Sequence, residues 1–478
     1  MRWKSCLKLM ALLAILSLAL ALAEADEAGK HVATNANVRL TVLYNFGTES
    51  DLIYPAGPIV AQGRDGSFYT NTVYGGTYND GVVFKIAPNG TPTVIGELNT
   101  NYGATGLSLG ADGNFYGTTS YGGLAGGYGT IFKVSANGKM TTLYEFSGQG
   151  EDGYPMAPPI QANDGNFYGT ARGDLNGNGA EVYKMTPAGV EKPLFTFVRK
   201  QGAAPADPLL QATDGNFYGT TGGGGASGRC GDYGCGTVFR VTPNGTFTQL
   251  HSFLVKDFDG YYPYAPVTEG SDGNLYGTVT RGGQYGYGIV YRINRTGNKY
   301  TILHSFNITD GEAPFTGLVQ ATDGNLYGTT MGGGASNVGT IFRITSGGQF
   351  SVIYSFDPTT GKYPSAGLLQ NTNGKLYGFA GEGGTYNYGT FFSVDINAQP
   401  FVSLVTSAGK VGKSVGTLGQ GFTGTTSVSF HGKAAKFNVK SDTFLTAIVP
   451  NRATTGYVTV TTPNGDLKSN RRFRVIPK

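Results

Sequence analysis

One short phrase recurs seven times along the chain and constrains its fold more than any other feature. Its clearest copy reads Asp-Gly-Asn-Phe-Tyr-Gly-Thr and runs from Asp112 to Thr118. Exact or looser copies begin at Asp65, Asp164, Asp214, Asp272, Asp323 and Asn373. The steps between successive copies are 47, 52, 50, 58, 51 and 50 residues. Repetition at a period of this size indicates a solenoid, a propeller or an array.

Each repeat contains four short runs of strand composition separated by turn residues. An apolar run precedes the phrase, as at Leu209-Leu210 in the fourth repeat. In the second repeat the phrase is followed by Gly122-Gly123, a β-type run over 129–134, a turn at Asn137-Gly138 and another run over 142–146. Asp-Gly and Asn-Gly favour tight hairpins, because type I′ turns need positive φ at both central residues. We therefore expect four antiparallel strands per repeat, with the Asp-Gly turn between the first and second.

The order of the strands predicts a closed ring. The run Leu43–Phe46 has the composition of a fourth strand but precedes the first phrase, and the last repeat stops after its third strand at Val394. An N-terminal strand that completes the last sheet would remove the open edge. We therefore expect an all-β fold whose residues 37–397 form a seven-bladed β-propeller of four-stranded blades, closed by the N-terminal strand. An open β solenoid is the alternative.

A second unit is expected over residues 398–478, where the phrase no longer occurs. Strand-like runs continue at 427–430, 435–439, 444–449, 457–461 and 473–476. Their length and the turn signals between them are typical of a small immunoglobulin-like β-sandwich.

The N-terminal segment has the features of a secretory signal peptide. Arg2, Lys4 and Lys8 precede an apolar run over 9–22, which ends at small residues suitable for cleavage. We expect a signal peptide over 1–25, a flexible segment over 26–36, and a mature protein that is secreted or displayed at the cell surface. No later segment is apolar enough for a membrane span, so we expect none in the mature chain.

The charge balance argues against nucleic acid as a partner. Discounting Arg2, Lys4 and Lys8 leaves 32 Lys and Arg against 31 Asp and Glu. Nucleic-acid binding needs a basic stripe, which a nearly neutral chain does not suggest. We expect a monomer whose partner is an extracellular glycan or a surface protein.

Two cysteines and one acidic loop are candidates for covalent or metal crosslinks. Cys230 and Cys235 lie in one glycine-rich loop of the fourth repeat, and in an exported protein such a pair is expected to form a disulfide. Asp174, Asn176 and Asn178 match the first half of a calcium-binding loop, but Met185 stands where the bidentate Glu is expected. Calcium is therefore a possible cofactor, an ordinary Asn/Gly loop is the alternative, and no other cofactor is indicated.

Both units resemble known families. The order of Asp-Gly-Asn-Phe-Tyr-Gly-Thr-Thr, the Gly-Gly loop and Gly-Thr-x-Phe resembles the GloVer-type (choice-of-anchor) tandem repeat of bacterial exported proteins, from about Leu43 to Val394. That resemblance implies an extracellular or cell-surface location and brings no catalytic residue. Residues 398–478 resemble an IPT/TIG domain through 419–422, 428–432, 448–450, 456–460 and 463–465. Such domains act as spacers or interaction modules in exported bacterial proteins.

The most promising place for function is one face of the predicted propeller. The loops after the second strand and the loops after the fourth strand share that face, which we call the loop face, and both are long and rich in tyrosine. Rigid scaffolds commonly present functional residues on such loops. Tyrosine combines a flat apolar ring with a hydroxyl, which suits a polyhydroxylated ligand. The predicted ligand-binding residues are Tyr121, Tyr128, Tyr285, Tyr287, Tyr386 and Tyr388.

No catalytic residue can be assigned from the sequence. It contains no Gly-x-Ser-x-Gly and no His-Glu-x-x-His, and it has only four histidines. Carboxylates such as Glu151, Asp152, Asp259 and Asp310 occur singly on the loop face. The sequence leaves enzymatic activity open and favours a non-catalytic binding protein. The alternatives are a carbohydrate-active enzyme, such as a polysaccharide lyase or hydrolase, and a purely structural or adhesive exoprotein.

Overall fold

The protein is described by a computed structural model covering residues 38–47, 52–55, 59–99, 104–123, 127–148, 153–173, 179–226, 230, 233–256 and 258–476. The structure of these residues is all-β, as predicted, and contains no α-helix. The predicted signal peptide over 1–25 and the segment over 26–36 lie outside the described residues. Within the described ranges, no helix has the length and apolar character needed to cross a membrane.

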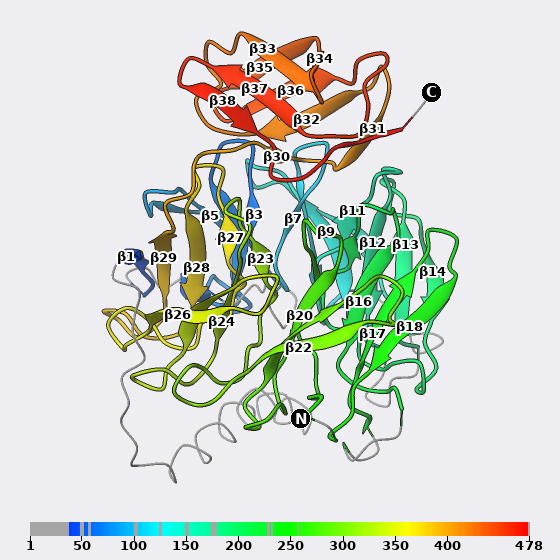
Figure 1. The fold of residues 1–478 in the computed structure, drawn as a ribbon, viewed down its shortest axis with the longest axis vertical. Coiled ribbons are helices and arrows are strands. Elements are labelled where there is room, and N and C mark those ends of the chain that lie inside the picture. The colour runs from blue at the N-terminus through cyan, green and yellow to red at the C-terminus, as the bar shows by residue number, and fades with distance from the viewer. Residues whose placement is uncertain are drawn as a thin grey trace. The chain divides into compact units, whose positions relative to one another are not determined.

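The repeats form antiparallel sheets, as predicted, and within the described residues six of these sheets have four strands and one has five (Figure 1). The first strands are β3 (Ala61–Gln62), β7 (Ser108–Leu109), β11 (Ile160–Gln161), β15 (Leu210–Gln211), β19 (Thr268–Glu269), β23 (Val319–Gln320) and β27 (Leu369–Gln370). The second strands are β4 (Phe68–Tyr74), β8 (Phe115–Thr119), β12 (Phe167–Ala171), β16 (Phe217–Thr221), β20 (Leu275–Val279), β24 (Leu326–Thr330) and β28 (Leu376–Ala380).

The third and fourth strands complete these sheets. The third strands are β5 (Val82–Ile86), β9 (Thr130–Val134), β13 (Glu181–Met185), β17 (Thr237–Val241), β21 (Ile289–Ile293), β25 (Thr340–Ile344) and β29 (Thr390–Asp395). The fourth strands are β6 (Pro92–Glu97), β10 (Met140–Glu145), β14 (Glu191–Thr196), β18 (Phe247–Ser252), β22 (Tyr300–Ser305) and β26 (Phe350–Ser355). The sheet of the first repeat has an additional short strand, β2 (Ile53–Pro55), which pairs with β4.

The last sheet takes its fourth strand from the N-terminal part of the chain. β1 (Arg39–Asn45) pairs antiparallel with β29, from Arg39 opposite Asp395 to Asn45 opposite Thr390. The register shifts between Val42 and Tyr44, at the position where the fourth strands of the other sheets also shift. β1 therefore has the geometry of a fourth strand, although it lies about 350 residues before its partner.

Apolar clusters join neighbouring sheets. Each second strand is wholly buried except for the end of β4, so both of its faces pack against other side chains. One cluster contains Phe46, Phe68 and Phe84 together with Phe379 and Phe391, and thus joins the first sheet to the last. Burying one such phenylalanine contributes roughly 1.5 to 3 kcal/mol. Contacts between the two ends of the repeat array are therefore part of the core.

Glutamine side chains at the ends of the first strands also link successive sheets. Gln161 accepts a hydrogen bond from the backbone N–H of Ala111 at 2.7 Å and donates one to the carbonyl of Gly165 at 2.9 Å. The same links from one repeat to the next use Gln211, Gln320 and Gln370. Between the last repeat and the first, the N–H of Thr372 donates to Gln62 at 3.3 Å.

Residues after β29 form further sheets around a separate apolar core. One sheet contains β30 (Ser403–Leu404), β32 (Ser414–Leu418), β36 (Phe444–Ile448) and β35 (Phe437–Ser441). Another contains β34 (Lys433–Ala434), β33 (Ser427–Phe430), β37 (Val458–Thr462) and β38 (Gly465–Lys468). β31 (Ala408–Lys410) and β39 (Arg474–Ile476) pair in parallel. Their shared core includes Phe422, Phe430, Leu445 and Val460, and Figure 1 draws these strands together in orange and red.

The C-terminal sheets are hydrogen-bonded to the Asp-Gly and Asn-Gly turns of the repeats. The Thr443 hydroxyl donates to the carbonyl of Arg64 at 2.6 Å. Gln420 donates to the hydroxyl of Thr372 at 2.8 Å, and that hydroxyl donates to the carbonyl of Gly419 at 3.2 Å. The turn ends of the repeats, opposite the loop face, are thus partly covered by residues 398–476.

Candidate binding site on the loop face

The loops after the fourth strands share an unusual backbone conformation. In six of them, the residue before a proline has a φ between 50° and 63°: Tyr54, Tyr154, Ala204, Tyr262, Ala313 and Tyr363. Positive φ is uncommon for non-glycine residues, and such conformations persist only where the surrounding contacts impose them. The repetition of this conformation indicates that a common set of contacts fixes these loops.

Hydrogen bonds to two sheets supply those contacts. The N–H of Tyr154 donates to the carbonyl of Tyr128, in the preceding repeat, at 2.7 Å. The carbonyl of Tyr154 accepts from the N–H of Arg172, at the end of its own second strand, at 3.2 Å. Tyr54 and Ala313 donate in the same way to the carbonyls of Tyr388 and Tyr287. The loop face is therefore a preorganised surface, because each loop is held between neighbouring sheets.

The six predicted tyrosines have three different surroundings. Tyr121 and Tyr128 are half-buried and lie with their ring centroids 5.3 and 5.5 Å from that of Tyr154. Tyr388 packs against Tyr54 at 5.2 Å. These rings contact one another, so part of each is used in packing.

The remaining three predicted tyrosines do not form a single cluster. Tyr287 is partly buried against the core between the fifth and sixth sheets. Tyr285 and Tyr386 are 52% and 48% exposed. Equivalent positions in their repeats are occupied by Tyr128, Tyr287 and Tyr388, and the backbone carbonyl at this position accepts a hydrogen bond from the next loop. In other repeats this position is occupied by Cys235 and Val338. Tyr285 and Tyr386 are thus the two predicted residues whose rings are most available to a ligand.

Exposed aromatic side chains concentrate on the loop face. Among the described residues, every exposed tyrosine or phenylalanine belongs to a loop or strand end on this face: Tyr74, Tyr78, Tyr233, Phe258, Tyr285, Phe315, Tyr386 and Tyr388. Single exposed apolar residues are common on protein surfaces, but their restriction to one face is informative.

A second group on the loop face, which the sequence analysis did not identify, surrounds Asp207. Seven residues before the Asp-Gly turn, the fourth repeat has Asp207, whereas other repeats have Ala157, Ala265 and Ala366. Oδ2 of Asp207 lies 3.0 Å from the hydroxyl of Thr220. Burial raises the pKa of Asp207 to about 7, and the hydrogen bond with Thr220 offsets only part of that rise.

The hydrogen-bond geometry is consistent with a neutral Asp207. The hydroxyl of Thr220 lies 3.0 Å from Asp207 and 3.1 Å from the carbonyl of Ala265. One hydroxyl has only one proton to donate. If Asp207 is protonated, it can donate to Thr220, and Thr220 can donate to Ala265.

Aromatic and basic groups lie beside Asp207. The pKa of Tyr264 is raised first by burial; the charge of Arg172 opposes this rise, and the charge of Asp207 adds to it. The ring of Tyr264 lies 5.8 Å from that of Tyr262 and 5.7 Å from that of Phe315. Gly222 leaves room for Tyr264, because a Cβ there would lie 2.3 Å from the ring. We call Arg172, Asp207, Tyr262, Tyr264 and Phe315 the Asp207 cluster.

The structure describes only some of the remaining residues that the sequence analysis singled out. Cys230 and Cys235 are joined by a disulfide with a Cα–Cα distance of 5.3 Å, and the carbonyl of Cys235 accepts a hydrogen bond from Tyr262. Asp174, Asn176 and Asn178 lie outside the described residues, as do Glu151 and Asp152. Within the described part of the chain, no group of three or more His, Cys, Asp or Glu side chains is arranged to hold a metal.

The two histidines near the loop face have packing contacts. The ring of His251 stacks on Tyr300 at 4.0 Å, and Nε2 lies 2.9 Å from Asp259. His304 stacks on Phe350 at 3.6 Å, and its Nε2 lies 3.2 Å from Asp310. Each histidine thus occupies a fourth-strand position within an aromatic cluster.

Comparisons with known proteins identify the repeat and the general fold. A family model described as the Gloeobacter/Verrucomicrobia repeat matches residues 31–231 and 229–436. No curated protein sequence matched the chain.

Several solved structures have a similar fold. Virginiamycin B lyase from Staphylococcus aureus, solved as a catalytically inactive variant with quinupristin, is similar over 75% of this chain and all of its own, with 16% identity and a TM-score of 0.54. A streptogramin B lyase is similar over 75% of this chain and 97% of its own, with 15% identity and a TM-score of 0.51. A fungal alcohol oxidase in complex with copper is similar over 89% and 98%, with 14% identity and a TM-score of 0.50. At these identities the similarity shows a propeller-like fold, and it carries no information about activity.

Proposed function

This chain belongs to the Gloeobacter/Verrucomicrobia repeat family, and we propose that it is an exported or cell-surface protein whose loop face binds an extracellular glycan or protein without catalysis. The observation that carries this proposal is the restriction of exposed tyrosine and phenylalanine side chains to the loop face. Aromatic rings with a polar hydroxyl provide stacking and hydrogen bonding on a rigid scaffold. Several similar loops could also each make a weak contact, and together these contacts would raise the overall affinity for a polymeric ligand.

The architecture proposed for this function is a seven-bladed propeller over 37–397, followed by an IPT/TIG-like sandwich over 398–478. The pairing of β1 with β29, the link from Thr372 to Gln62 and the shared core around Phe46 support closure of the ring. A closed ring has no open sheet edge, so it would present the loop face as a stable monomer. Two sheets around one apolar core support the sandwich.

The proposed location follows from the N-terminal sequence and the cysteines. The basic and apolar residues of 1–25 match a secretory signal peptide. A disulfide in the fourth repeat is stable in an oxidising compartment. The mature protein would then meet glycans and surface proteins of the cell exterior, and not nucleic acid.

A carbohydrate-active enzyme is the second candidate, and the Asp207 cluster favours it. A carboxyl group with a pKa of about 7 can donate or accept a proton at neutral pH. Tyr264 supplies an adjacent hydroxyl, and Arg172 supplies a charge that could stabilise an anion. This arrangement suits acid–base cleavage of a polysaccharide, as in a lyase or hydrolase.

One experiment separates the two candidates. The mature protein is incubated with a panel of soluble plant, algal and bacterial polysaccharides, and both binding and the size of the products are measured. The proposal expects saturable binding with no change in polymer size. Depolymerisation that is lost in Asp207→Asn would support the enzyme, and the absence of binding to every polysaccharide would leave only the protein-ligand form of the proposal.

A further inference from the structure

The charges of the chain are divided unequally between its two parts. Residues 398–478 contain 11 Lys and Arg and only two Asp, whereas residues 37–397 contain 20 Lys and Arg and 26 Asp and Glu. The nearly neutral total therefore conceals a strongly basic C-terminal part. Lys410, Lys413, Lys433, Lys436 and Lys440 are exposed, and none of them forms an ion pair with another described residue.

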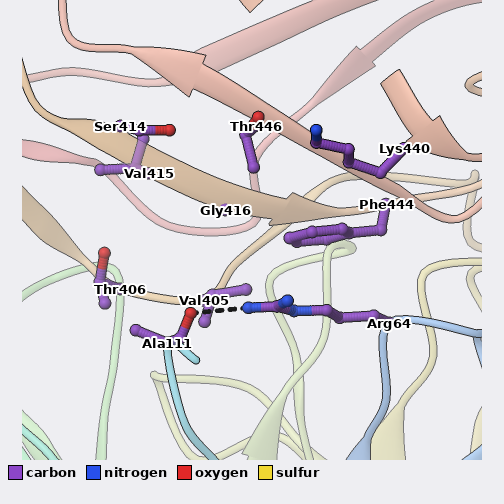
Figure 2. A pocket seen from close by; sticks show the side chains of 10 residues that line it. All are labelled: Arg64, Ala111, Val405, Thr406, Ser414, Val415, Gly416, Lys440, Phe444 and Thr446. Atoms are coloured by element: carbon purple, nitrogen blue, oxygen red, sulfur yellow. Dashed lines mark hydrogen bonds between the residues drawn. The ribbon is translucent and has the colours of Figure 1, made fainter. Parts of the chain in front are cut away.

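A pocket lies where this basic part meets the turns of the first two repeats. Its volume is about 530 Å³, within the range of ligand sites in proteins. Arg64 and Ala111 line it from the repeats, and Lys440, Phe444 and Ser414 are among the residues that line it from the C-terminal sheets. Figure 2 shows Arg64 below the ring of Phe444 and Lys440 above that ring, toward Thr446.

The strand register places the polar groups of the C-terminal sheet on the pocket side. Leu445 and Ala447 of β36 point into the sandwich core, so Phe444 and Thr446 have the opposite orientation. Gly416 lies opposite Thr446 on β32, and a Cβ at Gly416 would lie 3.0 Å from the Phe444 ring. The small residue therefore leaves space for the aromatic ring in the wall of the pocket.

Arg64 is positioned in the pocket but keeps donors available. Its Nη2 donates to the carbonyl of Ala111 at 2.6 Å, and its guanidinium lies 4.3 Å from the centre of the Phe444 ring. Its Nε is buried and has no hydrogen-bond partner. Desolvation lowers the pKa of Arg64, and the charge of Asp112 opposes that effect. An anion in the pocket would add negative charge to that of Asp112 and would supply hydrogen-bond acceptors for Arg64.

We propose that this pocket binds an acidic sugar residue of an anionic polysaccharide. Arg64 and Lys440 would hold the carboxylate or sulfate, the hydroxyls of Ser414 and Thr446 would bind sugar hydroxyls, and Val405 would contact the apolar face. The exposed lysines of the C-terminal part would attract the rest of the polymer. This site is distinct from the loop face, so it does not depend on the function proposed there.

The pocket fits an acidic sugar better than a nucleic acid. Single-stranded nucleic acids are bound by stacking bases on open aromatic faces. Phe444 is the aromatic residue among those that line the pocket, and the guanidinium of Arg64 already covers a face of its ring. Hydroxyl and cationic groups of the pocket therefore remain available to a ligand. They are complementary to the hydroxyls and the acid group of a uronic acid or a sulfated sugar.

The test is titration of the mature protein with polygalacturonate and with dextran sulfate, using methyl-esterified polygalacturonate and plain dextran as uncharged counterparts. Lys440→Gln should weaken binding of the preferred acidic polymer by about tenfold or more, because a charge-assisted hydrogen bond is lost. Lys440→Arg should retain binding. Lys433→Gln is the matched control, because Lys433 is an exposed lysine on β34 that does not line the pocket.

Each outcome either supports or overturns the site. Whichever acidic polymer binds more tightly identifies the acid group as carboxylate or sulfate, and Val190→Ala, at an exposed residue of the repeats that does not line the pocket, should leave that binding unchanged. Equal weakening by Lys440→Gln and Lys433→Gln would mean diffuse attraction and overturn the pocket. Binding of the neutral counterparts equal to that of the acidic polymers would also overturn it, as would tighter binding of a single-stranded oligodeoxynucleotide or no binding of either acidic polymer.

Discussion

The hydroxyl of Tyr116 donates a hydrogen bond to Oδ2 of Asp112 at 2.9 Å, so the repeated phrase fastens its own turn to the following strand. Oδ1 of the same carboxylate accepts from the backbone N–H of Asn114 at 3.0 Å. Asp164 with Tyr168 and Asp214 with Tyr218 form the same pair, at 2.8 and 2.7 Å. The tyrosine of the phrase is thus required both for its buried ring and for its hydroxyl.

Removing that hydroxyl should destabilise the repeat array. We expect Tyr116→Phe to lower the free energy of unfolding by about 1 to 2 kcal/mol, because a hydrogen bond to a charged group is lost. Tyr377→Phe is the matched control, since Tyr377 accepts from the neutral amide of Asn373 instead. Its effect, measured by denaturant unfolding, should be smaller. An equal loss in both variants would show that the charge of Asp112 is unimportant.

The effect of Tyr116→Phe should also depend on pH. Burial raises the pKa of Asp112, but hydrogen bonds from Asn114 and Tyr116 outweigh it and leave the pKa lowered. A lowered pKa in the folded state gives stability that is present above the unfolded pKa of about 3.9 and is lost as the pH falls. The difference between wild type and variant should therefore shrink below about pH 4.

Asp207 should have the opposite pH dependence. Its pKa is raised to about 7 in the folded protein, so the folded state binds more protons than the unfolded state between about pH 4 and pH 7. Stability from this group is then lost as the pH rises. Asp207→Asn should stabilise the protein by about 4 kcal/mol at pH 8 and change little at pH 4. Thermal melts at both pH values measure this, and equal effects at the two would contradict the raised pKa.

The N-terminal strand should be essential for the ring. Deleting residues 37–48 removes β1 and Phe46, exposes the edge of β29 and opens the cluster around Phe68 and Phe391. We expect an unfolded or aggregated protein, because an open strand edge and apolar surface are exposed together. The check is size-exclusion chromatography with a thermal melt. A soluble variant with an unchanged cooperative melt would contradict closure by this strand.

Local sequence patterns predicted the repeating architecture. The features that were not predicted depend on contacts between repeats. The Asp-Gly turns and the short runs of strand composition between turns predicted the four-stranded sheets, which the structure confirms. The link between Gln161 and Ala111 joins residues 50 positions apart, and no local pattern indicates it. The same holds for the positive φ of Tyr154, which follows from contacts with neighbouring loops.

The candidate site was only partly visible in the sequence. Tyrosine content indicated the loop face, but it could not separate the packed Tyr128 from the exposed Tyr285. Asp207 is perturbed by its burial, which depends on the assembled loops. A comparison of equivalent repeat positions offers a signal for it, because alanine stands at that position in several other repeats. The basic character of residues 398–478 could have been found by counting charges separately for each part.

Calcium binding by the third repeat remains a prediction from the sequence. If Asp174, Asn176 and Asn178 hold calcium, its removal should lower the melting temperature, because a ligand bound only by the folded state stabilises it. The measurement is a thermal melt with EDTA and after calcium is restored, together with metal analysis of the purified protein. Asp174→Ala should abolish the response. An unchanged melt and no detectable calcium would exclude the site.

The function of the loop face is tested most directly by the binding of the best polysaccharide from the screen to three versions of the mature protein. These are wild type, the double variant Tyr285→Ala with Tyr386→Ala, and a control in which the exposed Val190 and Val198 are changed to alanine. We predict that the tyrosine variant keeps its melting temperature but binds at least about tenfold more weakly, because each stacking ring contributes roughly 1 kcal/mol. The valine control should bind as wild type does. Folded tyrosine variants that bind as tightly as wild type would contradict recognition through these tyrosines.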